Sequence, residues 1–310
     1  MFPVLRILFP YDFTDVGRAT LPYAAELARS LDAELHLLHA LHYPGLLDAE
    51  LASEEGDLGA TFDLLHTRAG KELSVAASKL GSGAPGAEGL VRTCHVAVHR
   101  PPATAILDHA REHQIDLVVM ATHGRRGIGR VVLGSVTSEV VRASHVPVLV
   151  LRDPASAKAW TGLERILVPH DTSEHSQRAL AVAKELAAWS GAGLDLLHVL
   201  PDPVMPTFYG TSVAAIYDTH RGPLREETLK ELERLQAAAP GEAVPFRCHV
   251  RNGDPSREIL AAAGELESDL VLLSSHGLTG LDRLLLGSVA ERLIRACVTP
   301  VLVVRPSPAD

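Results

Sequence analysis

The 310-residue sequence has little cysteine, no long hydrophobic run and no excess of positive charge. Its three cysteines, at positions 94, 248 and 297, are too few and too scattered for a disulfide framework, which fits a reducing compartment. No stretch approaches the roughly 18 consecutive apolar residues that a membrane-spanning helix needs. These absences argue against a disulfide-stabilised secreted domain and predict that no segment crosses a membrane.

Acidic residues outnumber basic ones, 38 to 29, so the formal net charge is −9. This diffuse acidic balance argues against nucleic acid or an anionic membrane as the main partner, because both favour a basic surface. The first residues, MFPVLRILFPYDF, are apolar but are interrupted by Arg6 and Pro10, and they lack the hydrophobic core and cleavage site of a signal peptide. We therefore expect a cytoplasmic protein with no membrane or nucleic-acid partner.

The chain carries one sequence pattern twice. VVLGSVTSEVVRASHVPVLVLR at 131–152 recurs as LLLGSVAERLIRACVTPVLVVR at 284–305, and ILFPYDFTD at 7–15 recurs as ILVPHDTSE at 166–174. The offset is 159 residues early in each half and 153 residues late, so the first half contains six additional residues in its middle. The repeat and the chain length predict two domains, residues 1–152 and 163–310, joined by the linker at 153–162.

Each half alternates short apolar runs with helix-like stretches. Within the helix-like stretch at 14–31, apolar residues recur at three- and four-residue spacing. Nearly continuous apolar strands are typical of a parallel sheet that is buried on both faces. The predicted fold is α/β, with two tandem doubly wound domains that each contain a five-stranded parallel sheet. The expected strands lie at 4–9, 35–40, 90–98, 116–121, 147–151, 164–169, 194–199, 245–250, 269–274 and 300–304.

A glycine-punctuated loop follows the fourth expected strand of each half. It reads ATHGRRGIGRVVLGS at 121–135 and SSHGLTGLDRLLLGS at 274–288. Ligands of open α/β sheets bind at the carboxyl ends of the strands, where these loops fall. Small residues leave backbone N–H groups bare, and a helix N-terminus adds donors and partial positive charge. Both loops are therefore predicted to hold a phosphate, with Ser135 and Ser288 as hydroxyl donors. The alternative is that these serines are only helix N-caps.

Both halves resemble universal stress protein domains over essentially their whole length. The family pattern is Gly, two residues, Gly, nine residues, then Gly-Ser or Gly-Thr. Its first glycine is replaced by Ala121 and Ser274, which matters only if that position needs a positive φ. The resemblance implies a Rossmann-like fold of the adenine nucleotide alpha hydrolase type. The remaining matches are Gly124, Gly134-Ser135, Gly277, Gly287-Ser288, the Pro-x-Asp motifs at 10–12 and 169–171, and the Leu-Leu-His motifs at 37–39 and 196–198.

The resemblance implies that the halves bind ATP or another adenine nucleotide, and any bound cation is expected to be Mg²⁺ accompanying the phosphates. The family's ATP-binding branch places adenine and ribose near the Pro-x-Asp motif and the residue after Leu-Leu-His, and the phosphates in the glycine loop. In the first half the implied site residues are Pro10, Asp12, Ala40, Ala121, Thr122, His123, Gly124, Arg125, Arg126, Gly127, Gly134, Ser135, Val136 and Thr137. In the second half they are Pro169, Asp171, Val199, Gly253, Ser274, Ser275, His276, Gly277, Leu278, Thr279, Gly280, Gly287, Ser288, Val289 and Ala290.

The aspartates of the Pro-x-Asp motifs have a second interpretation, because they also fit a turn that caps the following helix.

The two halves differ in their implied site residues. The first loop is the more cationic one, whereas the second half carries Gly253-Asp254-Pro255 where the family packs backbone against the nucleotide. The first half has Arg100-Pro101-Pro102 there, and Arg100 is expected to crowd the base or to reach the phosphates. We expect both halves to bind, with unequal affinity.

No catalytic motif is evident in the sequence. It has no Gly-x-Ser-x-Gly elbow, no Walker lysine after the loop glycines and no Cys-x-x-Cys pair. This favours a nucleotide-binding regulator or sensor of the stress response over an enzyme. The alternatives are a nucleotide-free scaffold that recruits partners and a slow ATP hydrolase or phosphotransferase.

Sixteen histidines raise the question of a metal site. His36, His39 and His42 are spaced by three along an expected strand, which sends successive side chains to opposite faces and suits a tetrahedral site poorly. The pair Cys248-His249 resembles the pair Cys94-His95, but it lies one residue away from the position that the 153-residue offset gives. The histidines are therefore predicted to be packed or solvated side chains, with no metal held by the protein alone.

The resemblance also implies how the two halves associate. Family domains dimerise through their final strands, here at 146–151 and 300–304. A covalent tether raises the effective concentration of such a contact. An intramolecular pair of the two halves is therefore expected, and a homodimer is a further expectation.

Overall fold

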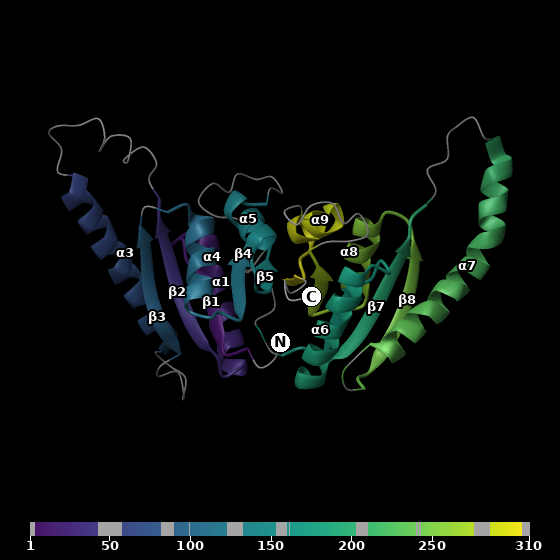
Figure 1. Ribbon diagram of the computed structural model, residues 1–310, viewed down its shortest axis with the longest axis horizontal. Helices are drawn as coiled ribbons and strands as arrows, with labels where there is room; N and C mark the ends of the chain where they lie inside the picture. Colours follow the sequence, from purple (N-terminus) through teal and green to yellow (C-terminus); the bar gives the residue numbers. More distant parts are fainter. Residues whose placement is uncertain are drawn as a thin grey trace. The chain divides into compact units, whose positions relative to one another are not determined.

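The computed structural model describes residues 4–42, 58–81, 90–98, 100–122, 133–152, 160, 162–202, 210–239, 241, 243–275 and 286–305. The chain divides into two compact units, Pro3–Thr161 and Gly162–Asp310. Each unit consists of a twisted sheet with helices packed against it (Figure 1).

The first unit is built from alternating strands and helices. Its five strands pair in the order β3-β2-β1-β4-β5, and every pairing is parallel. Along the chain the elements are β1 (Arg6–Pro10), α1 (Asp15–Ser30), β2 (Glu34–Leu41), α3 (Leu58–Gly81), β3 (Val91–Val98), α4 (Pro102–Glu112), β4 (Leu117–Ala121), α5 (Ser135–Ala143) and β5 (Val148–Leu151).

The second unit repeats this plan. Its strands pair in the order β8-β7-β6-β9-β10, again all parallel. The predicted α/β fold, with two doubly wound domains and five parallel strands in each, is confirmed. Its elements are β6 (Arg165–Pro169), α6 (Glu174–Ser190), β7 (Gly193–Leu200), α7 (Gly210–Ala238), β8 (Phe246–Asn252), α8 (Pro255–Glu265), β9 (Leu270–Ser274), α9 (Ser288–Ala296) and β10 (Val301–Val304).

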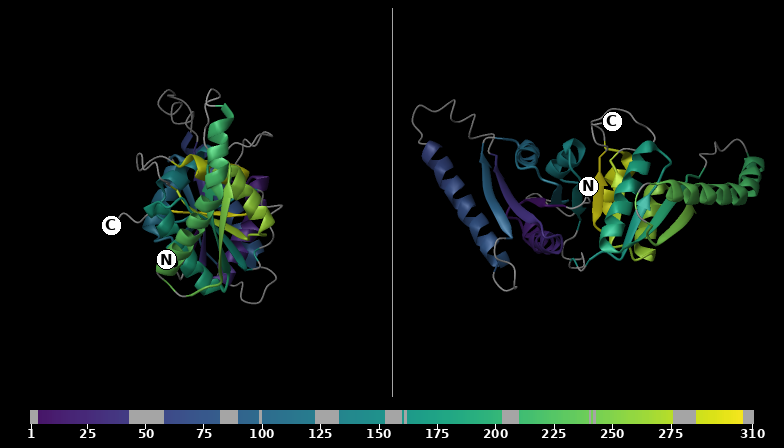
Figure 2. Two further views of the ribbon diagram at one scale, coloured as in Figure 1. Left: turned by 90° about the vertical axis from the view of Figure 1, so that its right-hand side faces the viewer. Right: turned by 60° about the horizontal axis from the view of Figure 1, so that its bottom comes forward.

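The strand order places helices on both faces of each sheet. From β1 the chain builds outward to β2 and β3 through α1 and α3, and then returns to β4 and β5 through α4 and α5. Because parallel crossovers are right-handed, the two sets of helices cover opposite faces. Figure 2 shows the long helices α3 and α7 running along the outer strands β3 and β8, which they contact.

The central strands carry the core of each unit. In β1, Ile7, Leu8 and Phe9 are at most 1% exposed, and in β6 the side chains of 166–168 are fully buried. Successive residues of a strand point to opposite faces, so continuous burial requires cover on both. This is why these runs are apolar without alternation.

An aspartate at the start of the fourth strand ties the amino edge of each sheet together. In the first unit, Oδ2 of Asp116 accepts hydrogen bonds from the backbone N–H groups of Leu5, at 2.8 Å, and Arg6, at 2.9 Å. In the second unit, Oδ2 of Asp269 accepts them from residues 164 and 165, at 2.9 and 3.0 Å. The aspartate that opens each of these strands in the sequence therefore has a structural role, at the edge opposite to the glycine loop.

The sheet register corrects the comparison of the two Cys-His pairs. Leu37 pairs with Cys94 in the first unit, and its counterpart Leu196 pairs with Cys248 in the second. An irregularity in the pairing of β2 with β3, between Leu35 and His36, shifts the register and absorbs the one-residue mismatch. Cys94-His95 and Cys248-His249 thus occupy equivalent places in the two sheets. Comparing the two halves of the sequence at a constant 153-residue offset does not show this.

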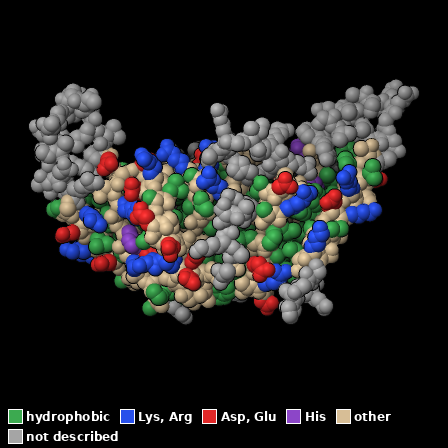
Figure 3. Space-filling view, turned by 180° about the vertical axis from the view of Figure 1, so that it is seen from behind, with side chains coloured by type: hydrophobic (Ala, Val, Ile, Leu, Met, Phe, Trp, Pro, Cys, Tyr) green, Lys and Arg blue, Asp and Glu red, His purple; other side chains and the backbone are tan. Residues whose placement is uncertain are grey.

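The hydropathy of the helices and the charges on the surface both agree with the composition. Among the described residues, no helix is long and apolar enough to cross a membrane. Acidic and basic side chains are interspersed over the face shown in Figure 3.

Removing the aspartate at the amino edge should destabilise the fold. We expect Asp116→Ala to lower the free energy of unfolding by about 2 kcal/mol, because two backbone N–H groups lose a charged acceptor. Urea unfolding of the full chain measures this change. Glu112→Ala, on the exposed end of α4, is the control and should change stability by less than about 0.5 kcal/mol. Equal effects of the two substitutions would contradict the assigned role.

Candidate functional site

The candidate site lies at the carboxyl edge of each sheet, where the strand order reverses. β1 pairs with β4 in the first unit and β6 pairs with β9 in the second, but the chain leaves the two strands of each pair toward opposite faces. Crevices at such switch points are where open α/β sheets bind ligands. Pro10 and Ala121 end the strands at the first switch point, and Pro169 and Ser274 end those at the second.

Backbone and side-chain bonds close the glycine loop of the first unit at its base. The N–H of Gly134 donates to the carbonyl of Thr122 at 2.8 Å, and Oγ1 of Thr137 donates to the carbonyl of Ala121 at 2.9 Å. A Cβ at position 134 would lie 3.0 Å from the Thr122 oxygen, closer than side chains usually approach. Glycine at 134 therefore permits the two ends of the loop to meet.

The second unit closes its loop in the same way. The N–H of Gly287 donates to the carbonyl of Ser275 at 3.0 Å, and the N–H of Ser275 donates to the carbonyl of Val304 at 3.1 Å. Ala290 occupies the place of Thr137 and has no hydroxyl to donate. The backbone closure is thus common to both units, whereas the threonine bond belongs to the first unit.

The helix after each loop begins at a glycine, not at a serine. Gly134 is the N-cap of α5, with φ −58° and ψ 140°, and Gly287 is the N-cap of α9, with φ −60° and ψ 143°; neither helix has a side-chain cap. The interpretation of Ser135 and Ser288 as N-caps is therefore wrong, and both are exposed residues of the first helical turn. The first helical bond to Gly134 comes from the N–H of residue 138, so the amides of residues 135–137 precede the helical ladder and are oriented to bind an anion.

The aspartate after the first strand of each unit forms the expected turn. Oδ1 of Asp12 accepts hydrogen bonds from the N–H of Thr14 at 3.1 Å and from its hydroxyl at 2.7 Å. Oδ1 of Asp171 accepts the same pair of bonds from Ser173, at 3.1 and 2.5 Å. Thr14 and Ser173 are themselves the N-caps of α1 and α6. The aspartates thus form the expected turn, but the helix caps are Thr14 and Ser173, and the turn holds each carboxylate in a set orientation.

A strained residue follows this aspartate in both units, which the sequence did not indicate. Phe13 has φ 62° and Thr172 has φ 65°. The left-handed region is uncommon for residues other than glycine, above all for a β-branched one such as threonine. Strain of this kind costs on the order of 1 kcal/mol or more and clusters at functional sites. Its recurrence at equivalent positions therefore supports the switch points as the candidate sites.

The histidine of the Leu-Leu-His motif links the second strand to the residue after the first. Nδ1 of His39 lies 2.7 Å from the carbonyl oxygen of Tyr11, and Nδ1 of His198 lies 2.7 Å from that of His170. Since a carbonyl only accepts, each Nδ1 carries a proton and donates it. These bonds set the position of the two strand ends where Ala40 and Val199 lie.

Aromatic side chains distinguish the two switch points. In the first unit, the ring of Phe13 lies 4.3 Å from that of His39 and 4.9 Å from that of Tyr11, measured between centroids. The equivalent residues after β6 are His170 and Thr172. The first unit therefore has an aromatic wall of Tyr11, Phe13 and His39 beside Asp12, whereas the second unit has His170 and Thr172 at the positions of Tyr11 and Phe13.

The loop after the third strand also differs between the units. Gly253 has φ 134°, a conformation reserved for glycine, and its N–H donates to the carbonyl of Leu200 at 3.0 Å. Asp254 caps α8 by accepting from the N–H of Arg257 at 3.0 Å. In the first unit, Nη1 of Arg100 is paired with Asp108 of α4 at 2.5 Å, so this guanidinium is engaged with the helix that follows it.

The structure leaves part of the predicted site undescribed. The described members all lie at the carboxyl edges, at strand ends, in the loops that follow them or in the first turns of α5 and α9, and these include Val136 and Val289. The role of each in binding stays a prediction. His123, Gly124, Arg125, Arg126, Gly127, His276, Gly277, Leu278, Thr279 and Gly280 lie outside the described residues.

His170, beside Asp171, is the most strongly perturbed group of the second site. It is 3% exposed, and its Nδ1 accepts a hydrogen bond from the N–H of Thr172 at 3.1 Å. Burial lowers the pKa of His170 from 6.5 to about 4. The ring is therefore neutral at neutral pH and supports the turn as an acceptor.

Comparison with known proteins identifies a family for both halves. The model of the universal stress protein family matches residues 4–152 and 162–305. Universal stress protein YxiE of Bacillus subtilis is 34% identical over 145 residues, which is 46% of this chain and 98% of that protein. Universal stress protein Mb2028c of Mycobacterium bovis is 30% identical over 241 residues, 77% of each chain. The crystal structure of a universal stress protein from Archaeoglobus fulgidus has the same fold, with a TM-score of 0.65 and 21% identity over 98% of this chain and 97% of that one.

The buried histidine of the second site should make the second unit sensitive to acid. The pKa of His170 is depressed in the folded state, so below pH 6.5 the unfolded chain takes up a proton that the folded chain excludes until about pH 4. Stability should fall across this window by about 1.4 kcal/mol per pH unit from this group, roughly 3 kcal/mol in all. His170→Asn keeps an acceptor for Thr172 but does not titrate, and should remove this part of the slope.

Urea unfolding between pH 7 and pH 4.5, followed by the fluorescence of Trp189 in a Trp160→Phe background, measures the effect in the second unit. His42→Asn, which removes a histidine from the first unit, is the control. An unchanged slope in His170→Asn would contradict the assignment.

Proposed function

Because the chain belongs to the universal stress protein family, with one family domain in each half, we propose that it binds adenine nucleotides at the carboxyl edges of both sheets. The ligand we propose is ATP with Mg²⁺ or another adenylate, and the role is that of a regulator or sensor of the stress response in the cytoplasm. The pairing of the two halves through their final strands stays a prediction.

One observation carries this proposal: the same backbone closure and the same helix start without a side-chain cap occur twice. In each unit a glycine N–H closes the loop onto the residue after the fourth strand, and the same glycine begins the next helix without a side-chain cap. Unpaired amides and the positive end of a helix dipole favour an anion such as a phosphate. The side chains around the closure differ between the units, so what is common to them is the arrangement of backbone donors.

The aspartate turn supplies the complementary part of the site. Each carboxylate is held by the residue two positions later, and a strained residue lies between them. A carboxylate oriented at a switch point is suited to accept a hydrogen bond from a ribose hydroxyl or the adenine amino group. Small or apolar residues at the neighbouring strand ends, Pro10 and Ala40 in the first unit, suit the flat face of a base.

We expect the two sites to differ in affinity. The first unit offers the aromatic wall of Phe13, Tyr11 and His39, and its loop sequence is the more cationic. The second unit offers the open backbone of Gly253. These differences alter the contacts to the base and to the phosphates separately, so the affinities need not match.

The proposal predicts a specific effect of negative charge at the helix starts. Titration calorimetry of the nucleotide-free protein with MgATP should show binding in both halves. Ser135→Asp should weaken binding in the first half at least tenfold, since the carboxylate repels phosphate and competes for the amides, and Ser288→Asp should do the same in the second half. An acidic residue in the first turn favours the helix itself, so stability should be kept or raised.

Ser78→Asp, which adds the same charge on the exposed surface of α3, is the matched control and should leave MgATP binding unchanged. The proposal fails if purified protein carries no nucleotide by mass spectrometry and also gives no heat with MgATP. It fails for one half if the aspartate there has no effect on binding.

A further inference from the structure

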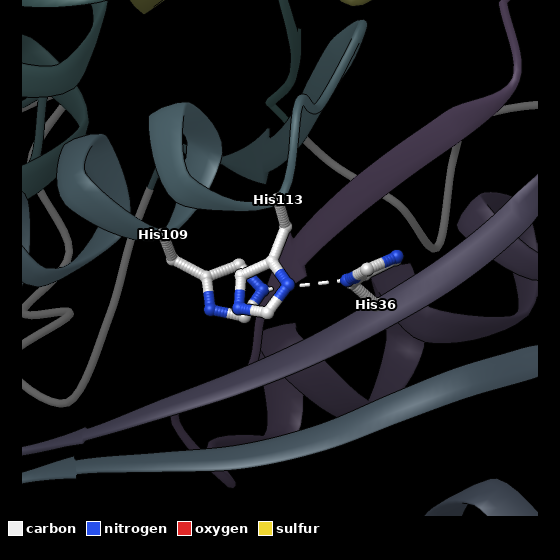
Figure 4. A group of neighbouring side chains, drawn as sticks. All are labelled: His36, His109 and His113. Carbon is white, nitrogen blue, oxygen red and sulfur yellow. Dashed lines mark hydrogen bonds between the residues drawn. The ribbon is translucent and has the colours of Figure 1, made fainter.

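Three histidines that are far apart in the sequence meet in the first unit. His36 lies on β2, His109 lies near the end of α4, and His113 follows that helix (Figure 4). One ring nitrogen of each lies within 4.8 Å of the others. His36 and His109 are each 3% exposed, whereas His113 is exposed. We propose that these three residues, called here the histidine triad, bind a divalent transition-metal ion of the zinc class.

The spacing of the ring nitrogens fits a metal ion. Nδ1 of His36 and Nε2 of His109 are 3.4 Å apart. Two nitrogen ligands at the usual zinc distance of 2.0–2.1 Å in a tetrahedral site lie about 3.3 Å from each other. The third ligand, His113, is one helical turn from His109 and so shares its side of the helix, with the two rings stacked at 4.1 Å between centroids. Binding one ion would require the stacked rings of His109 and His113 to rotate so that a nitrogen of each points at the ion.

A carboxylate lies behind the triad where metal sites commonly have one. Oε2 of Glu34 is 3.9 Å from Nε2 of His36. Nδ1 of His36 is the nitrogen that faces His109, so it is the one that we expect to bind the ion. At 3.9 Å the contact between Glu34 and His36 is not a hydrogen bond, so Glu34 would have to move closer to orient the ring of His36 as carboxylates do in metal sites.

The chemistry of the donors indicates the class of metal. Three imidazoles suit zinc, copper or nickel, whereas magnesium and calcium prefer oxygen ligands. Because His113 is at the surface, a water molecule is able to complete a tetrahedral site as the fourth ligand.

The histidine triad is separate from the proposed nucleotide sites and belongs to the first unit alone. α4 runs from the carboxyl edge of the sheet to the amino edge, so His113 at its end lies opposite to the glycine loop. The equivalent residues of the second unit are Asp195, Ala262 and Leu266. Asp195 is fully buried and takes part in ion pairs with Arg165, Arg247 and His249.

The test uses the untagged full chain, stripped of metal with a chelator. Calorimetric titration with Zn²⁺ should show one tight site per chain, and Co²⁺ should give the visible absorption of a tetrahedral complex. His113→Ala should weaken Zn²⁺ binding more than about 100-fold, because it removes one of the three ligands. His113 contributes only backbone to the helix end in the C-cap contacts, so the variant should fold; its metal-free melting temperature checks this.

His145→Ala removes another exposed histidine and should leave Zn²⁺ binding unchanged. Zinc should raise the melting temperature of the wild type but not of His113→Ala. Crystals soaked with Zn²⁺ should show an anomalous peak about 2.0–2.1 Å from Nδ1 of His36 and Nε2 of His109. Absence of a tight site, equal binding by wild type and His113→Ala, or a peak elsewhere would overturn the proposal. Nucleotide binding should be the same with and without zinc, so the two proposals fail independently.

Discussion

The candidate site in each half depends on one backbone hydrogen bond, from the glycine that begins the last helix to the carbonyl after the fourth strand. Gly134 and Thr122 make this bond in the first unit, and Gly287 and Ser275 make it in the second. It brings the two ends of the glycine loop together at the carboxyl edge, beside the aspartate turn after the first strand. A side chain at Gly134 would push against the carbonyl, so close approach is what the glycine provides.

Around this common closure the two halves have diverged. Phe13 and Thr172 share an unusual left-handed conformation but differ in the surface that they present. The threonine bond from helix to strand occurs in the first half, and the second half has alanine there. Backbone geometry is therefore the shared element of the two proposed nucleotide sites, and side chains are the means by which one copy differs from the other.

The third residue of β2 and of β7 shows the same divergence away from these sites. In the first unit His36 faces His109, and in the second unit the equivalent Asp195 is buried among two arginines and a histidine. Both arrangements place polar side chains together at the same strand position of the two sheets. A buried charge needs such partners, whereas a set of neutral imidazoles is suited to a metal ion.

Repeats, apolar runs and motif spacing are local in the sequence, so the sequence by itself determined the family, the tandem organisation and the strand–helix order. It also placed Pro10, Ala121 and their counterparts at strand ends, since the carboxyl ends of parallel strands share one edge. Only the tertiary structure decided that Gly134 and not Ser135 caps its helix, that Phe13 is left-handed, and that His36 meets His109. The histidine contact joins residues 73 positions apart, which no local pattern records. The cap and the strained turn are local in the chain, but their conformations depend on how the loop ends pack at the sheet edge.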